Sequence, residues 1–161
     1  MAGYVKIGDI KGESVDKNHK DWINVLSVSQ SLTRPMSAGI SGSTRQRASV
    51  TCGDVVLVKE MDASTPKLIQ PVCDGTVFPK VEIDLCTSTG AASRVPYYQF
   101  ELVNVMVSDY SVSGATDGPQ VPTESISLNY EEIRWTYDKM GKDGASKGKV
   151  DASWKVEEGV A

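Results

Sequence analysis

The chain has 161 residues, of which 40% are hydrophobic and 24% charged, and this composition predicts one globular domain over residues 1–161. The formal net charge of -4 argues against a nucleic-acid-binding protein, which would usually be basic. No stretch is long and apolar enough to span a membrane, and the N-terminus lacks a secretory signal sequence, so we expect neither membrane insertion nor signal-peptide export.

The first elements predicted along the chain are two strands separated by a loop. Alternating side chains predict a strand over residues 4–10 and a second strand over residues 22–28. Residues 11–21 are highly charged and predict an exposed loop that carries His19. The second strand has apolar residues on both faces, so we expect it to be covered both by the core and by something else.

Residues 30–49 predict a long loop, because they are rich in Ser, Gly, Thr and Arg and contain few large apolar residues. Loops of this length inside a compact domain are uncommon and are usually functional or disordered. Arg34, Arg45 and Arg47 give this segment a positive balance within an acidic protein. Two interpretations stay open: a solvated flexible loop, or an arm that docks onto an acidic neighbour.

A strand over residues 50–59 and a short helix over residues 65–73 are predicted next. Ser64 or Thr65 is suited to capping the helix, Pro66 to its first turn and Gly75 to its C-terminal cap. Pro71 lies inside the segment and is expected to kink or shorten the helix.

The remaining predicted strands cover residues 81–85, 97–107 with an extension past residue 109, and 150–156. Residues 113–123 predict a Gly/Pro loop, and the Lys-rich residues 139–149 predict a connector, most simply a solvated hairpin tip.

The most informative pattern lies in residues 124–137. Its apolar positions alternate up to Tyr130, lose one residue of phase, and alternate again from Ile133, which predicts one long strand with a bulge near residues 131–132. Together, about seven strands and one helix predict an all-β fold, either a β-barrel or a two-sheet sandwich, with one short flanking α-helix.

The sequence offers little catalytic chemistry. His19 is the only histidine, no serine lies in a nucleophile motif, and no phosphate-binding glycine loop is present. Cys52, Cys73 and Cys86 are widely spaced, which favours reduced, mostly buried thiols over a disulfide or a zinc site. We therefore expect no enzyme activity, catalytic residue, cofactor or metal.

A carbohydrate-binding or hydrolytic β-sandwich is the alternative from another class of function. Carboxylates on separate strands could form a hydrolytic site, and the three tryptophans could form a sugar-stacking platform. Each tryptophan, however, lies in an alternating apolar pattern, which favours core packing.

Four segments, in the same order and spacing, resemble the haemolysin-coregulated protein (Hcp) family of type VI secretion. Residues 5–14 read VKIGDIKGES and residues 19–27 read HKDWINVLS. Residues 62–68 read DASTPKL, and the late segment reads ESISLNY over residues 124–130 and IRWTY over residues 133–137. The resemblance covers essentially the whole chain.

This resemblance implies homo-hexameric rings with a wide channel, stacked into the inner tube that a contractile sheath expels. It implies the sheath, baseplate and spike proteins as partners, small effector proteins as cargo, and one-step export from the cytoplasm to the extracellular space or a target cell. Ser29 matches a serine associated with the channel wall and cargo, and Arg34, Arg45 and Arg47 lie where subunits or rings make contact. A phage tail-tube protein shares this architecture and is the closer alternative.

Overall fold

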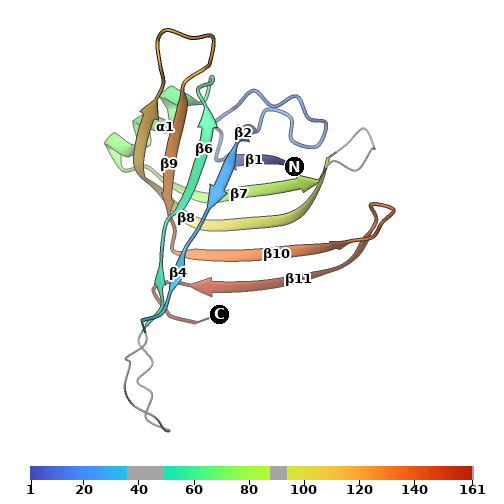
Figure 1. Cartoon of the computed structure of the whole chain (residues 1–161). Coiled ribbons are helices and arrows are strands. Elements are labelled where there is room, and N and C mark those ends of the chain that lie inside the picture. The colour runs from blue at the N-terminus through green and yellow to red at the C-terminus, as the bar shows by residue number, and fades with distance from the viewer. Residues whose placement is uncertain (36–48, 88–93, 161) are drawn as a thin grey trace.

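The computed structural model describes residues 1–35, 49–87 and 94–160 (Figure 1). The elements, in chain order, are β1 (Ala2–Ile7), β2 (Ile23–Val25), β3 (Ser27–Ser29), β4 (Leu32–Thr33), β5 (Thr51–Cys52), β6 (Val55–Glu60), α1 (Thr65–Asp74), β7 (Val77–Thr87), β8 (Val95–Ser113), β9 (Thr123–Asn129), β10 (Glu132–Met140) and β11 (Ser146–Lys155). The predicted all-β fold with one helix is therefore confirmed.

The main sheet closes on itself into a barrel. Neighbouring strands pair in the order β2-β1-β7-β8-β9-β6-β3, and only Leu26 separates β2 from β3 along the chain. The backbone N–H of Leu26 donates to the carbonyl of Val58 at 2.7 Å, which holds the β2–β3 segment against β6. The strand predicted over residues 22–28 is thus two short strands that join the two edges of the sheet.

A hairpin extends the sheet outside the barrel. The C-terminal part of the 19-residue strand β8 pairs with β9, whereas its N-terminal part pairs with β10, which in turn pairs with β11. Figure 1 shows β10 and β11 lying beside β8 and away from β6. β10 ends later and β11 begins earlier than the sequence suggested, so only residues 141–145 form the turn, and the connector predicted over residues 139–149 is wrong in extent.

The strand predicted over residues 124–137 is divided into β9 and β10, so the single bulged strand is wrong although the loss of phase is real. Tyr130 points inward and is 5% exposed, and its hydroxyl donates to the carbonyl of Gly53 at 3.0 Å. Opposite the break, Asn104 has a φ of 50° and donates to the Glu131 carboxylate at 2.7 Å. Both β9 and β10 pair with β8 on one side. On the other side β9 pairs with β6 and β10 pairs with β11, so the break lies where this partner strand changes.

The helix predicted over residues 65–73 is confirmed as α1, which runs to Asp74 and is therefore not shortened at Pro71. Pro71 removes one helical N–H but buries its ring. Gly75 ends the helix in the left-handed region with a φ of 72°, and its N–H donates to the carbonyl of Pro71 at 2.9 Å. The side chain of Ser64 makes no cap bond to the helix; instead Asp62 accepts the backbone N–H of Ser64 at 2.9 Å.

The apolar core fills the barrel. Its fully or nearly fully buried members come from every long strand of the barrel and from α1 and β10, and include Val5, Ile7, Ile23, Leu57, Leu68, Ile83, Leu102, Ile126, Leu128 and Ile133. The alternation in the sequence corresponds to this inward face.

A polar cluster lies in this core beside the start of α1. Lys59 and Glu124 are each 1% exposed, and the Lys59 Nζ lies 2.5 Å from a Glu124 carboxylate oxygen and 2.9 Å from Asp62 Oδ1. Glu124 also accepts hydrogen bonds from Thr65 Oγ1 at 3.0 Å and from the Tyr110 hydroxyl at 2.8 Å. Buried charges are tolerated only when they are paired in this way.

Candidate functional site

The residues assigned to assembly and cargo lie on the surface as far as they are described. Ser29 is exposed at the end of β3, opposite Val56 of β6, and Arg34 is exposed just after β4. Arg45 and Arg47 lie outside the described residues. The exposure of Ser29 and Arg34 is what a contact role needs, and their roles stay predictions.

The exposed loop predicted over residues 11–21 is confirmed for most of its residues, but His19 itself is buried. The residue is 2% exposed and lies over the outer face of the sheet, where its ring stacks on Tyr4 at a centroid distance of 4.4 Å. Its Nδ1 lies 2.8 Å from an Asp16 carboxylate oxygen, and its Nε2 lies 3.0 Å from Asp84 and 3.9 Å from the Cys86 sulfur. Residues 11–22 therefore form an ordered cover over β1 and β7.

This arrangement of cysteine, histidine and aspartate resembles a catalytic triad in composition only. Cys86 is 0% exposed, and burial, reinforced by the negative charges of Asp84 and Asp16 and opposed by Arg94, raises the pKa of its thiol to about 12. A cysteine nucleophile needs a lowered pKa and access to substrate. The cluster holds the loop to the barrel rather than presenting a reactive group.

The sequence contained no local signal for this cluster. Asp84 comes from β7, 65 positions after His19, and in the sequence it only alternates with apolar residues. β7 has a β-bulge between Leu85 and Cys86. Here its inner face packs in the barrel and its outer face lies under residues 11–22, so both faces of the strand are buried.

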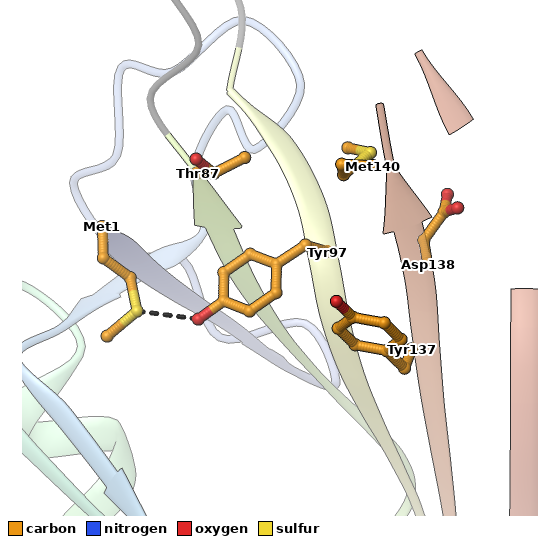
Figure 2. Close-up of a pocket in the computed structure, with 6 residues that line it drawn as sticks. All are labelled: Met1, Thr87, Tyr97, Tyr137, Asp138 and Met140. Atoms are coloured by element: carbon orange, nitrogen blue, oxygen red, sulfur yellow. Dashed lines mark hydrogen bonds between the residues drawn. The ribbon is translucent and has the colours of Figure 1, made fainter. Parts of the chain in front are cut away.

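A hollow of about 330 Å³ lies where β8 and β10 approach the N-terminus. Its lining residues, drawn in Figure 2, are Met1, Thr87, Tyr97, Tyr137, Asp138 and Met140. Tyr97 reaches from β8 towards Met1, and its hydroxyl donates to the Met1 sulfur at 2.8 Å. Asp138 already accepts the Ser146 hydroxyl at 2.5 Å, so the described lining provides no pair of nucleophile and base.

The two ends of the β10–β11 hairpin carry opposite charges. Around the turn are the exposed side chains of Lys139, Lys142, Lys147 and Lys149. At the other end, Glu131, Glu132, Glu157 and Glu158 surround a hollow of about 130 Å³ together with Lys155, which pairs with Glu158 at 3.5 Å. Figure 1 shows the turn and the end of β11 at opposite sides of the molecule. The first end is called the lysine tip and the second the glutamate base.

The tryptophans form no platform. Trp135 and Trp154 pack against the core, and Trp22 lies edge-on to His19 at 4.9 Å. Trp135 Nε1 donates to Gln30 Oε1 at 2.9 Å. Core packing, favoured from the sequence, is confirmed for Trp135 and Trp154.

The three thiols are free, as predicted, although only Cys86 is buried, while Cys73 is exposed. Within the described parts of the chain, no group of three or more His, Cys, Asp or Glu side chains is placed to hold a metal ion. The helix that the structure describes is too short and too polar to cross a membrane.

Separate comparisons with known proteins point to the same family. The family model described as "Type VI secretion system effector, Hcp" matches residues 4–137. Protein hcp1 of Pseudomonas aeruginosa is 31% identical over 158 residues, which cover 98% of this chain and 96% of that protein. The Major exported protein of the same species is 25% identical, over 85% of this chain and 81% of its own length.

Solved structures show the same fold. A type six secretion system protein superposes with a TM-score of 0.90 at 28% identity, covering 98% of this chain and 97% of its own. Hcp1 from Salmonella typhimurium has a TM-score of 0.77 at 23% identity, covering 98% and 95% of the two chains, and supports the fold alone.

Proposed function

This chain belongs to the Hcp family of type VI secretion proteins, and we propose that it builds the inner tube as homo-hexameric rings that stack and carry small effectors. The family match makes it a tube protein of type VI secretion. The relatives match over almost the whole chain, which supports a single tube domain over residues 1–161. A structural role also agrees with a buried, unreactive Cys86 and with the absence of enzyme activity that we propose.

The observation that carries the ring proposal is an apolar surface left uncovered on strands of the sheet. Leu26 between β2 and β3 is 62% exposed, and Tyr137 and Val150, which pair across the β10–β11 hairpin, are 46% and 57% exposed. Neighbouring large apolar side chains that are exposed together on a sheet mark surfaces for partners, and Tyr137 and Val150 are such neighbours. The segment around Leu26 was expected to be covered on both faces, and a neighbouring subunit would provide the second cover.

We expect the purified protein to form six-subunit rings. Apolar burial between subunits drives the association, so the ring should persist at high salt. Native mass spectrometry at micromolar concentration measures the subunit number, and electron microscopy shows whether a central channel is present. A monomer as the only species would contradict the proposal.

Within such rings, we propose that Ser29 faces the channel and cargo, and that Arg34, Arg45 and Arg47 contact a neighbouring subunit or ring. The sheath, baseplate and spike proteins would be the further partners, and the protein would be cytoplasmic before it is exported. The relative described as the Major exported protein supports secretion.

The lysine tip and the glutamate base provide a physical basis for head-to-tail stacking. β11 spans ten residues, so the two charged ends lie about 30 Å apart. When copies stack in one direction along the hairpin, the tip of one meets the base of the next. Each exposed pair contributes only about 0–1 kcal/mol, but every subunit of a ring repeats it. Complementary charge mainly sets orientation and register.

We therefore expect the double variant Lys142→Glu/Lys147→Glu to form rings but to lose stacking at low salt. The variant Glu157→Lys/Glu158→Lys should fail in the same way, because both of its ends are then basic. Mixing the two variants should restore stacks, since each then offers the charge that the other lacks. Electron microscopy and light scattering against salt concentration measure ring and stack length.

The matched control for the lysine-tip variant is Lys17→Glu/Lys67→Glu, which makes the same change in net charge at exposed sites away from the hairpin and should stack like the parent. Equal stacking by the parent and both hairpin variants would exclude the charge contact while leaving the ring proposal intact.

A further inference from the structure

The single histidine lies between two carboxylates. Nδ1 of His19 is 2.8 Å from an Asp16 oxygen, and Nε2 is 3.0 Å from an Asp84 oxygen. The side chain of His19 is 3% exposed, and those of Asp16 and Asp84 are 11% and 9% exposed, so water has little access to any of the three. Both ring nitrogens are therefore at hydrogen-bond distance from groups that are ordinarily acceptors.

The positions of these atoms bear on the number of protons in the group. An ionised carboxylate only accepts hydrogen bonds, and a neutral imidazole has one N–H donor. With one ring proton, the lone pair of the other nitrogen would face a carboxylate oxygen about 3 Å away, which is repulsive. One proton more than two carboxylates and a neutral imidazole hold would remove this repulsion, because each ring nitrogen could then donate to a carboxylate oxygen.

The surroundings favour this extra proton on the imidazole. The hydrogen bond with His19, more than any other influence, lowers the pKa of Asp16, so this carboxyl group is ionised. The second oxygen of Asp84 accepts the side-chain amide of Gln99 at 2.9 Å. The Tyr4 ring lies parallel to the imidazole, which suits a cation on an aromatic face.

Two further groups face the cluster. The Cys86 thiol is 3.9 Å from Nε2, farther than the Asp84 oxygen, and its raised pKa keeps it neutral. Arg94 donates to the Tyr4 hydroxyl, and its guanidinium lies 5.9 Å from the Tyr4 ring centre. Arg94 opposes the extra charge, while the two carboxylates in direct contact with His19 favour it.

We propose that this extra proton latches residues 11–22 onto the outer face of β1 and β7 and makes the segment a pH-responsive cover. The loop supplies Asp16 and His19, and the barrel supplies Asp84 and Tyr4, so the His19–Asp84 bond joins the loop to the barrel, whereas the Asp16–His19 bond lies within the loop. Loss of the proton places an unscreened lone pair against Asp84, frees the loop, and uncovers Tyr4 and Cys86. This inference does not depend on ring assembly.

The direct test uses the unsubstituted protein. His19 is its single histidine, so every histidine signal in its NMR spectrum comes from this residue. Nitrogen-detected NMR of the ring at pH 7.5 should show protons on both nitrogens, each with a hydrogen bond to a carboxylate. A single protonated nitrogen at this pH would overturn the proposal.

The second test compares stability against pH in the parent and in Asp84→Asn. An asparagine can donate its amide to Nε2 and still accept Gln99 with its oxygen, so the variant needs no extra proton. Free imidazole loses its proton near pH 6.5, so above that value the unfolded parent binds fewer protons than the folded parent. The parent's folding equilibrium constant should then fall by up to about tenfold per pH unit relative to the variant.

Hydrogen exchange identifies the part that opens. In the parent, the amides of residues 11–22 should lose protection as pH rises, by more than the increase in the intrinsic exchange rate accounts for. The amides of β8 and β9 should keep their protection. In Asp84→Asn this selective loss should be absent. Identical pH dependence of stability and of loop exchange in the two proteins would contradict the latch, and the NMR measurement on the parent decides the question even if the variant folds poorly.

Discussion

Replacing Lys59 by Met should lower the free energy of unfolding by about 3–5 kcal/mol, because it leaves the Glu124 carboxylate buried without its cation. Glu124 is 1% exposed and its nearest partner is the Lys59 ammonium at 2.5 Å. Thr65 and Tyr110 still donate to Glu124 in the variant, but neither carries a charge. Asp62, which also contacts Lys59, would lose the same partner.

Combining Lys59→Met with Glu124→Leu should recover most of the loss. The pair costs much desolvation free energy when it is buried, so two apolar side chains of similar volume are about as stable as the ion pair. Chemical denaturation followed by circular dichroism measures all three proteins. If the double variant is no more stable than Lys59→Met alone, the loss comes from packing rather than from an unpaired charge.

Lys80→Met is the matched control, since it removes a lysine with equally good ion pairs at the surface. Lys80 lies 3.0 Å from Glu82 and 3.1 Å from Glu101, but its side chain is 49% exposed. Exposed pairs contribute about 0–1 kcal/mol, so this change should be small. A similar loss at Lys59 and Lys80 would contradict the importance of burial.

The strands were predictable because their signal is local. Ile126 and Leu128 alternate with polar residues and lie inside the barrel, and Gly75 ends α1 as its position suggested. The loss of phase after Tyr130 was also visible in the sequence. Its consequence was not, because the change of neighbour from β6 to β11 depends on strands elsewhere in the chain.

The polar clusters were not predictable, because their partners are far apart in sequence. Lys59 and Glu124 are separated by 65 positions, as are His19 and Asp84. In the sequence each looks like an ordinary charged residue at the end of a strand or in a loop. Closure of the barrel and the fold of residues 11–22 bring the partners together, and neither leaves a periodic pattern.

Replacing Gly12 by Ala should destabilise the protein by about 1–3 kcal/mol or more, as overpacking of a filled site does. A Cβ atom at Gly12 would lie 2.5 Å from the carbonyl oxygen of Trp22, 2.6 Å from the Cα of Ile23 and 2.8 Å from its nitrogen. All three are backbone atoms, so no flexible side-chain end can move aside. Residues 11–14 read KGES and belong to one of the segments that resemble the Hcp family. The close backbone contacts give a physical reason for the glycine in this segment.

The effect of Gly12→Ala should concentrate on the cover formed by residues 11–22. Gly12 N–H donates to the Asp21 carbonyl at 2.9 Å, and Ser14 N–H donates to that of Trp22 at 3.0 Å, so a shift at Gly12 disturbs both bonds. Chemical denaturation gives the loss of stability. Labelling of Cys86 in a Cys52→Ser/Cys73→Ser background, at one pH, shows whether the cover has opened, because this thiol is otherwise fully buried.

Gly118→Ala is the control that separates contact from glycine flexibility. Nothing lies within 4 Å of the Cβ position at Gly118, so an added methyl group meets open space. Such a surface change should stay within about 0.5 kcal/mol of the parent and leave Cys86 labelling unchanged. If Gly12→Ala matches Gly118→Ala in both measurements, the backbone at Gly12 has room for a side chain and the close approach to Trp22 and Ile23 does not hold the cover in place.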